Sequence, residues 1–140
     1  MKSIEQVRVL GPTRERTQVE LSRTDGMTVG LALPLRDSGD LDGTPGVVLS
    51  GPKGTVVLDE GTIRASRHIH CSPAEAGRLG ISSGDRISVR IPGPLEVTLG
   101  NVLVRVNEKS KLEMHLDTDE GNAADVRCGD FAYVYWRKEK

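Results

Sequence analysis

The residues best suited to chemistry in this 140-residue sequence are its three histidines, because neutral imidazole nitrogens bind divalent metal ions. His68 and His70 lie one residue apart, and alternate side chains of an extended strand share a face, so both rings can reach one ion. His115 lies in a second alternating segment, between the carboxylates of Glu113 and Asp117, which can orient its ring. The spacing predicts a metal site formed by the three histidines.

A simpler interpretation of the same histidines is a polar, solvated strand face. We favour the metal site because no histidine is used elsewhere and the third has acidic neighbours. Cys71 follows His70 and suggests a thiol nucleophile, but strand alternation sends the two side chains to opposite faces. We therefore expect Cys71 and Cys128 to be small, buried packing residues.

Two arginines and one glutamate are weaker candidates. Arg14 and Arg16 flank a turn, where a planar guanidinium can grip a phosphate, although surface arginines are often only solvated. Glu20 lies on the polar face of a probable strand and is a candidate metal ligand, which spacing alone does not decide. A phosphate-binding loop over residues 46–51 is excluded, because Pro52 stands where such a loop needs lysine.

The charge balance gives no reason to propose nucleic acid or an anionic membrane as a partner, since 19 Lys and Arg face 20 Asp and Glu. Two cysteines are too few for a disulfide framework, and residues 1–5 do not read as the start of a signal peptide. No apolar run approaches the roughly 20 residues needed to span a bilayer. We expect a cytoplasmic protein.

The fold predicted from the many short alternating runs is mainly β, with two small β-barrels, one of them incomplete, and short helices. A composition step near Ser66 divides the chain. We expect residues 1–65 to form a partial β-barrel carrying Arg14 and Glu20, and residues 66–140 to form a β-barrel carrying the three-histidine metal site.

Individual elements follow from turn and capping signals. Ser72, Pro73 and Glu75 predict the start of a brief helix that ends at Gly80, and Asp117 or Thr118 can cap a second helix over 119–124. We expect a hairpin around 51–54, an exposed, mobile loop over 37–46, a break at Gly26-Met27 before 28–35, and strands over 7–11, 17–21, 86–91, 95–99, 102–106 and 131–136. In the last strand, we expect Phe131, Tyr133 and Tyr135 to close a small core.

Several of these segments together resemble one enzyme family. Arg67-His68-Ile69-His70, residues 112–124, 10–14 and 17–25 are similar to the phosphotransacylases of propanediol utilisation, also called phosphate propanoyltransferases. The resemblance covers nearly the whole chain. It implies a pair of β-barrels with two zinc ions between them, and transfer of a short acyl group between coenzyme A and inorganic phosphate.

Carried onto this sequence, the resemblance implies that His68, His70 and His115 hold one zinc, that Glu20 binds the other, and that Arg14 binds phosphate. Coenzyme A, acyl-phosphate and inorganic phosphate are the implied partners, and association with a bacterial microcompartment is implied as well. Members of the family carry an earlier Arg-His-x-His motif in a further N-terminal segment, and the sequence as given begins after it. We therefore expect a homo-oligomer, or a partner chain that supplies a second His-x-His.

Two functional hypotheses follow from the sequence. The first is a zinc-dependent phosphate acyltransferase, complete or as a fragment. The second is a non-catalytic metal-binding barrel subunit or fragment that needs a partner chain to complete the site. A metal-dependent hydrolase is disfavoured, because no spare carboxylate at a clear spacing stands out as a general base.

Overall fold

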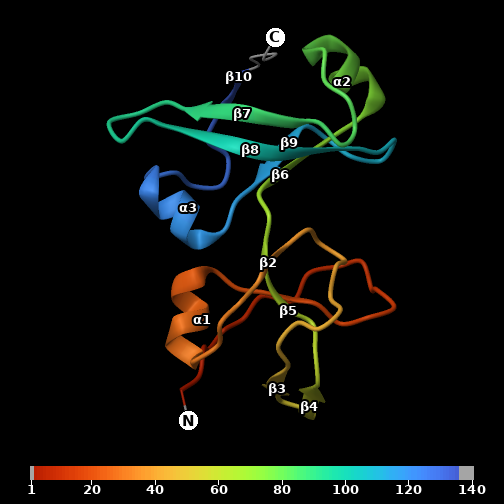
Figure 1. The fold of residues 1–140 in the computed structure, drawn as a ribbon, viewed down its shortest axis with the longest axis vertical. Helices are drawn as coiled ribbons and strands as arrows, with labels where there is room; N and C mark the ends of the chain where they lie inside the picture. The colour runs from red at the N-terminus through yellow and green to blue at the C-terminus, as the bar shows by residue number, and fades with distance from the viewer. Residues whose placement is uncertain (1, 136–140) are drawn as a thin grey trace. The chain divides into compact units, whose positions relative to one another are not determined.

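The computed structural model describes residues 2–135 and is mainly β with short helices, which confirms the predicted fold class (Figure 1). The chain divides after Ala65 into two compact units, which we call the N-terminal unit and the C-terminal unit. Trp136, at the end of the predicted last strand, lies outside the described residues. Within residues 2–135, no helix is long and apolar enough to cross a bilayer.

The sheet of the N-terminal unit is small. Its central strand β5 (Thr62–Ala65) pairs in parallel with β1 (Val19–Glu20) and with β2 (Leu35–Arg36). The predicted hairpin is confirmed, with β3 (Val47–Gly51) antiparallel to β4 (Gly54–Leu58). The predicted strand over 7–11 is wrong, since these residues form neither helix nor strand.

A short helix, α1 (Arg23–Val29), occupies the place where the sequence predicted a break. Ser22 caps it, and the Asp25 side chain returns a hydrogen bond to the cap, which is a capping box with aspartate in place of the usual glutamate or glutamine. Gly26 is buried within the helix. A Cβ atom at this position would lie 2.7 Å from the Leu33 Cδ1 atom, which leaves no room for a larger residue. Close packing, and not a turn, therefore explains this glycine.

The loop over residues 37–46, predicted to be exposed, is exposed or half-buried except at two positions that anchor it. Leu41 and Thr44 within it are buried. The Thr44 hydroxyl donates to the carbonyl of Leu41 and accepts from the Gly61 amide at 2.9 Å. One apolar residue and one satisfied hydroxyl thus hold this polar loop against the sheet.

The C-terminal unit contains a larger sheet that curls into a half-barrel. Parallel pairing of β6 with β8 lies at its centre, and the remaining pairs are antiparallel. In spatial order the strands are β10 (Tyr133–Tyr135), β7 (Arg86–Ile91), β8 (Val97–Val106), β6 (His68–Cys71) and β9 (Glu113–His115).

Strand β8 replaces the two strands predicted over 95–99 and 102–106. The chain does not turn at Gly100-Asn101; Asn101 takes a positive φ of 57°. The register of β7 against β8 shifts between Ile87 and Val89, as expected for a β-bulge. The extra residue bends the ribbon without ending the strand.

Both predicted helices of the C-terminal unit are confirmed. Helix α2 (Pro73–Leu79) begins at the Ser72 cap with Glu75 completing the capping box, and it ends at Gly80 with a φ of 67°. Helix α3 (Thr118–Ala123) begins at Asp117, whose side chain accepts from the Glu120 amide.

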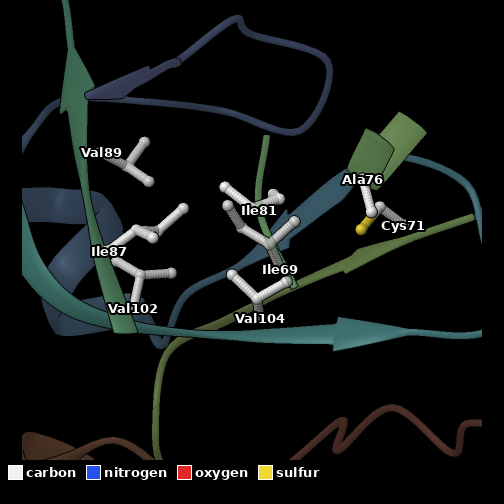
Figure 2. Packing of buried hydrophobic residues seen from close by; sticks show 8 residues of the cluster. All are labelled: Ile69, Cys71, Ala76, Ile81, Ile87, Val89, Val102 and Val104. Atoms are coloured by element: carbon white, nitrogen blue, oxygen red, sulfur yellow. The ribbon is translucent and has the colours of Figure 1, made fainter. Parts of the chain in front are cut away.

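The core of the C-terminal unit lies on one face of the sheet, where Ala76 of α2 and Ile81 after it join the strand residues. Figure 2 shows Cys71 of β6 beside Ala76 of α2, and Ile69 between Ile81 and Val104. Cys71 is fully buried, which confirms its predicted packing role, but Cys128 is exposed, so the same prediction for it is wrong. The predicted aromatic core is also wrong: Phe131, Tyr133 and Tyr135 are 84%, 61% and 47% exposed.

Candidate metal centre

Strands β6 and β9 bring the three histidines together. The antiparallel register pairs His68 with His115 and Ile69 with Met114. Ile69 is buried in the core and Met114 packs against it, so alternation turns all three histidines to the other face of the sheet. The ring centroids lie 4.8 Å apart for His68 and His70, 4.9 Å for His68 and His115, and 5.0 Å for His70 and His115.

The three rings are close enough to share one ion. One ligand nitrogen from each ring can be chosen so that all three lie within 4.8 Å of one another. Zinc–nitrogen bonds of about 2.0–2.1 Å in tetrahedral geometry separate ligand nitrogens by roughly 3.4 Å, so modest ring rotations would suffice. Among residues 2–135, this is the only group of three or more His, Cys, Asp or Glu side chains with such spacing.

The surroundings of His70 favour its neutral imidazole. Burial lowers the pKa of His70, and the neighbouring His68, His115 and Arg105 lower it further, while Glu113 opposes the shift. A metal ion binds the neutral ring, so a lowered pKa reduces the competition between the proton and a metal at His70.

Of the other two rings, His68 has a backbone carbonyl as a neighbour and His115 has a carboxylate. The Nδ1 atom of His68 lies 2.8 Å from the Ser66 carbonyl oxygen, and in the tautomer that donates there Nε2 carries the lone pair that a metal would bind. The His115 Nε2 atom lies 3.8 Å from a Glu113 carboxylate oxygen. The Asp117 carboxylate, predicted as another possible partner of His115, instead caps α3.

Arg105 is a neighbour of the site that the sequence reasoning missed. The parallel register of β6 and β8 pairs it directly with His70, and paired residues in a sheet project to the same side. Strand alternation within 102–106 predicts that Arg105 projects to the face opposite Val102 and Val104, which are buried. What the sequence could not give was the pairing partner of that strand.

Arg14 and Glu20 belong to the N-terminal unit, where two side chains absent from the sequence reasoning connect them. The Arg14 guanidinium donates to the Ser38 hydroxyl at 3.1 Å. The Gln18 amide nitrogen lies within hydrogen-bonding distance of both Ser38 Oγ, at 2.9 Å, and the Glu20 carboxylate, while its oxygen accepts from the Gly39 amide. Arg14 and Glu20 are both exposed.

Arg16, the other candidate for a phosphate contact, is engaged by carboxylates. It forms ion pairs with Asp42, at 2.7 Å, and with Glu60. The hydrogen bond from Arg16 to Asp42 raises the pKa of the guanidinium above its ordinary value. The second Glu60 oxygen accepts from the Gly43 amide, so Arg16 acts in anchoring the 37–46 loop.

Comparison with known proteins identifies phosphate propanoyltransferases among the relatives of this chain. A family described as phosphate propanoyltransferase matches residues 1–127. Phosphate propanoyltransferases of Thermotoga maritima and Lachnoclostridium phytofermentans are 49% and 44% identical to the chain over 133 and 134 residues, which cover 94% and 96% of it. That of Planctopirus limnophila is 51% identical over 126 residues, 89% of the chain. The matches cover 63%, 63% and 52% of these relatives, so the chain spans less than two thirds of their length.

Proposed function

Because this chain belongs to the phosphate propanoyltransferase family, we propose that it carries out, alone or as part of a larger assembly, the transfer of a short acyl group between coenzyme A and inorganic phosphate. In this reaction a phosphate oxygen attacks the thioester carbonyl, the carbon–sulfur bond breaks, and acyl-phosphate and coenzyme A result. The single observation that carries the proposal is the cluster of three histidines, whose residue types fit a metal-assisted acyl transfer.

The proposed metal is zinc, held by His68, His70 and His115. Three neutral imidazoles with a free fourth position are a donor set typical of catalytic zinc, and the lowered pKa of His70 suits it. When bound, zinc would supply positive charge that stabilises a thiolate and a developing carbonyl oxyanion.

The proposed role of Arg14 is to bind and orient the phosphate. A guanidinium presents donors in a planar fork that matches two phosphate oxygens, and the Ser38 hydroxyl restrains one of its nitrogens. Within the C-terminal unit, Arg105 places a positive charge beside His70, which favours anionic groups near the cluster.

Glu20 is proposed as a ligand of a second zinc. One carboxylate is too few for tight binding, because such sites take three or four protein ligands. We propose that a second His-x-His, supplied by a partner chain, completes this site. The Gln18 amide would then hold the carboxylate in place.

Direct measurement of thioester formation tests the proposal. The purified chain is incubated with propanoyl-phosphate, coenzyme A and zinc, and thioester absorbance is followed with and without a chelator. We expect thioester formation that the chelator abolishes, either from the chain alone or after a partner containing His-x-His is added. A rate equal to background under both conditions would contradict the proposal.

The second candidate function is a non-catalytic metal-binding subunit. It is favoured by one observation: among residues 2–135, Glu20 is not part of any group of metal-binding spacing. Zinc bound at about one ion per chain, together with no thioester formation even in the presence of the partner, would support this function over the first.

The proposed setting is the bacterial cytoplasm, with association with a microcompartment, because this is where propanediol-utilisation enzymes of this kind are expected to act. Fractionation of cells that express the tagged chain tests this location. Recovery with the shell proteins supports the association, and recovery only in the free pool would contradict it.

A further inference from the structure

The position of His115 depends on few contacts. It lies at the end of β9, a strand of three residues at the edge of the sheet that pairs only with β6. Helix α3 begins after two intervening residues, and none of the residues from Thr118 to Ala123 is buried, although the C-cap residue Ala124 is. A contact between the first turn of α3 and β6 would therefore add to the strand pairing that holds the end of β9 near His68 and His70.

An ion pair spans this gap. The Arg67 guanidinium lies 3.3 Å from one oxygen of Glu120 in the first turn of α3. The other Glu120 oxygen accepts from the Asp117 amide at 3.1 Å, and the Asp117 side chain accepts from the Glu120 amide. Arg67 immediately precedes His68, and Asp117 follows His115 by two residues. A closed circuit of contacts therefore joins the two strands that carry the histidines.

Partial burial strengthens this pair relative to an ordinary surface pair. The Arg67 and Glu120 side chains are 30% and 22% exposed, against 52% and 48% for Arg90 and Glu96, a second Arg–Glu pair in the same unit. Solvent and salt screen exposed pairs most, so equal charges act more strongly at the less exposed location.

We propose that the Arg67–Glu120 ion pair is a positioning element that holds His115 against His68 and His70 and thereby sets the metal affinity of the cluster. The inference rests on the proposed metal-binding function of these histidines. It assigns a role to Arg67 and Glu120 beyond capping and surface charge, although neither side chain binds the ion.

The test compares four variants of the full chain. Arg67→Met removes the charge, Glu120→Gln removes the charge but keeps an oxygen that can accept from the Asp117 amide, and Arg67→Lys restores a cation. Arg90→Met is the matched control, because it breaks an Arg–Glu pair between β7 and Glu96 in the turn that precedes β8, away from the histidines in the same sheet.

Cobalt(II) serves as the probe, because its visible absorption reports both affinity and coordination geometry. We expect Arg67→Met and Glu120→Gln to weaken cobalt binding about 10-fold, the usual scale for residues that orient metal ligands, and Arg67→Lys to recover part of the loss. Arg90→Met should bind as the unmodified chain does. Equal affinity in all variants, or an equal loss in Arg90→Met, would overturn the inference.

A second measurement uses the metal-free protein. The stacked rings of His68 and His115, with centroids 4.9 Å apart, should give a nuclear Overhauser effect between ring protons. We expect it to persist in Arg90→Met and to weaken in Arg67→Met. If the unmodified chain binds no cobalt, the metal proposal fails, and this measurement alone decides the positioning role. An unchanged effect in Arg67→Met, or none in the unmodified chain, would refute that role.

Discussion

The two units of the chain assemble their candidate functional residues in different ways. In the C-terminal unit, strand register places His68 opposite His115, and alternation turns both away from a packed core. In the N-terminal unit, β1 has two residues, and Arg14 and Glu20 are connected through hydrogen bonds of Gln18 and Ser38. The first arrangement is set by backbone pairing, to which the Arg67–Glu120 ion pair adds support at the end of β9, and the second depends on side chains alone.

This difference has a consequence for how each unit responds to change. Backbone pairing holds a strand-borne ligand even when a neighbour on the opposite face is altered, because the ladder hydrogen bonds remain. An exposed network of side chains loses its geometry when one member is removed, since each hydrogen bond contributes only about 1 kcal/mol and the chains regain rotamer freedom.

The largest effect is expected from removing a histidine of the cluster. His68→Ala and His70→Ala should each reduce bound zinc from about one ion per chain to background, because two imidazoles do not hold zinc tightly. Cys71→Ala, on the opposite face of the same strand, should leave zinc content unchanged while lowering stability by about 1 kcal/mol through a small cavity. Elemental analysis measures the bound zinc, and equal zinc in all three variants would contradict the assignment of His68 and His70 as ligands.

A smaller effect is expected from Arg14→Ala in the N-terminal unit. Loss of charge-assisted hydrogen bonds worth about 1.5–3 kcal/mol should raise the KM for phosphate by about 10-fold or more while changing the KM for coenzyme A far less. Initial rates of acyl transfer, in the assembly found to be active, measure both constants. The role assigned to Arg14 fails if the phosphate constant does not move.

Removal of one helix cap in each unit tests whether the two units respond separately to a loss of stability. Ser22→Ala and Ser72→Ala each delete a capping-box hydroxyl, at a cost of about 1 kcal/mol. We expect hydrogen exchange to increase around α1 for the first and around α2 for the second, with the amides of the other unit unchanged. Increased exchange throughout the chain in either variant would show that the units do not respond separately.

The smallest effect is a pH dependence confined to the C-terminal unit. The pKa of His70 is lowered by its burial and by His68, His115 and Arg105, against an opposing effect of Glu113. Its unfolded pKa is about 6.5, so the unfolded state binds the proton more readily. The stability contributed by neutral His70 is therefore complete above that pH and is lost as the pH falls through it toward the lower folded pKa.

Denaturant unfolding of the metal-free chain between about pH 7.5 and about pH 5 measures this dependence. His70→Gln should show a shallower fall in unfolding free energy than the unmodified chain. Identical slopes for the two proteins would mean that His70 does not contribute.

Much of the C-terminal unit could be predicted from the sequence because its signals are local. Alternation around His68 predicted the shared face of the histidines, and Ser72 with Gly80 predicted both ends of α2. The short distance between His115 and the other two rings could be predicted only if the pairing of β6 with β9 was known. That pairing depends on contacts far apart in the sequence, for which alternation gives a face but no partner.

The errors have physical causes as well. From the sequence alone, Gly26, in the middle of α1, indicates a break between two elements. Its close packing against Leu33 explains why glycine occupies this helical position. Phe131 and its alternating neighbours read as a core face, because apolar composition does not reveal whether another layer covers it. The hydrogen bonds of Ser38 to Arg14 and to Gln18 join residues 24 and 20 apart in the sequence, and no periodicity reports such a network.

Anomalous scattering at the zinc absorption edge, from crystals grown with zinc, tests the central claim most directly. The account predicts a peak bound by one ring nitrogen each of His68, His70 and His115, at about 2.0–2.1 Å. A map with no peak among these three rings, or with zinc bound only elsewhere, would contradict it.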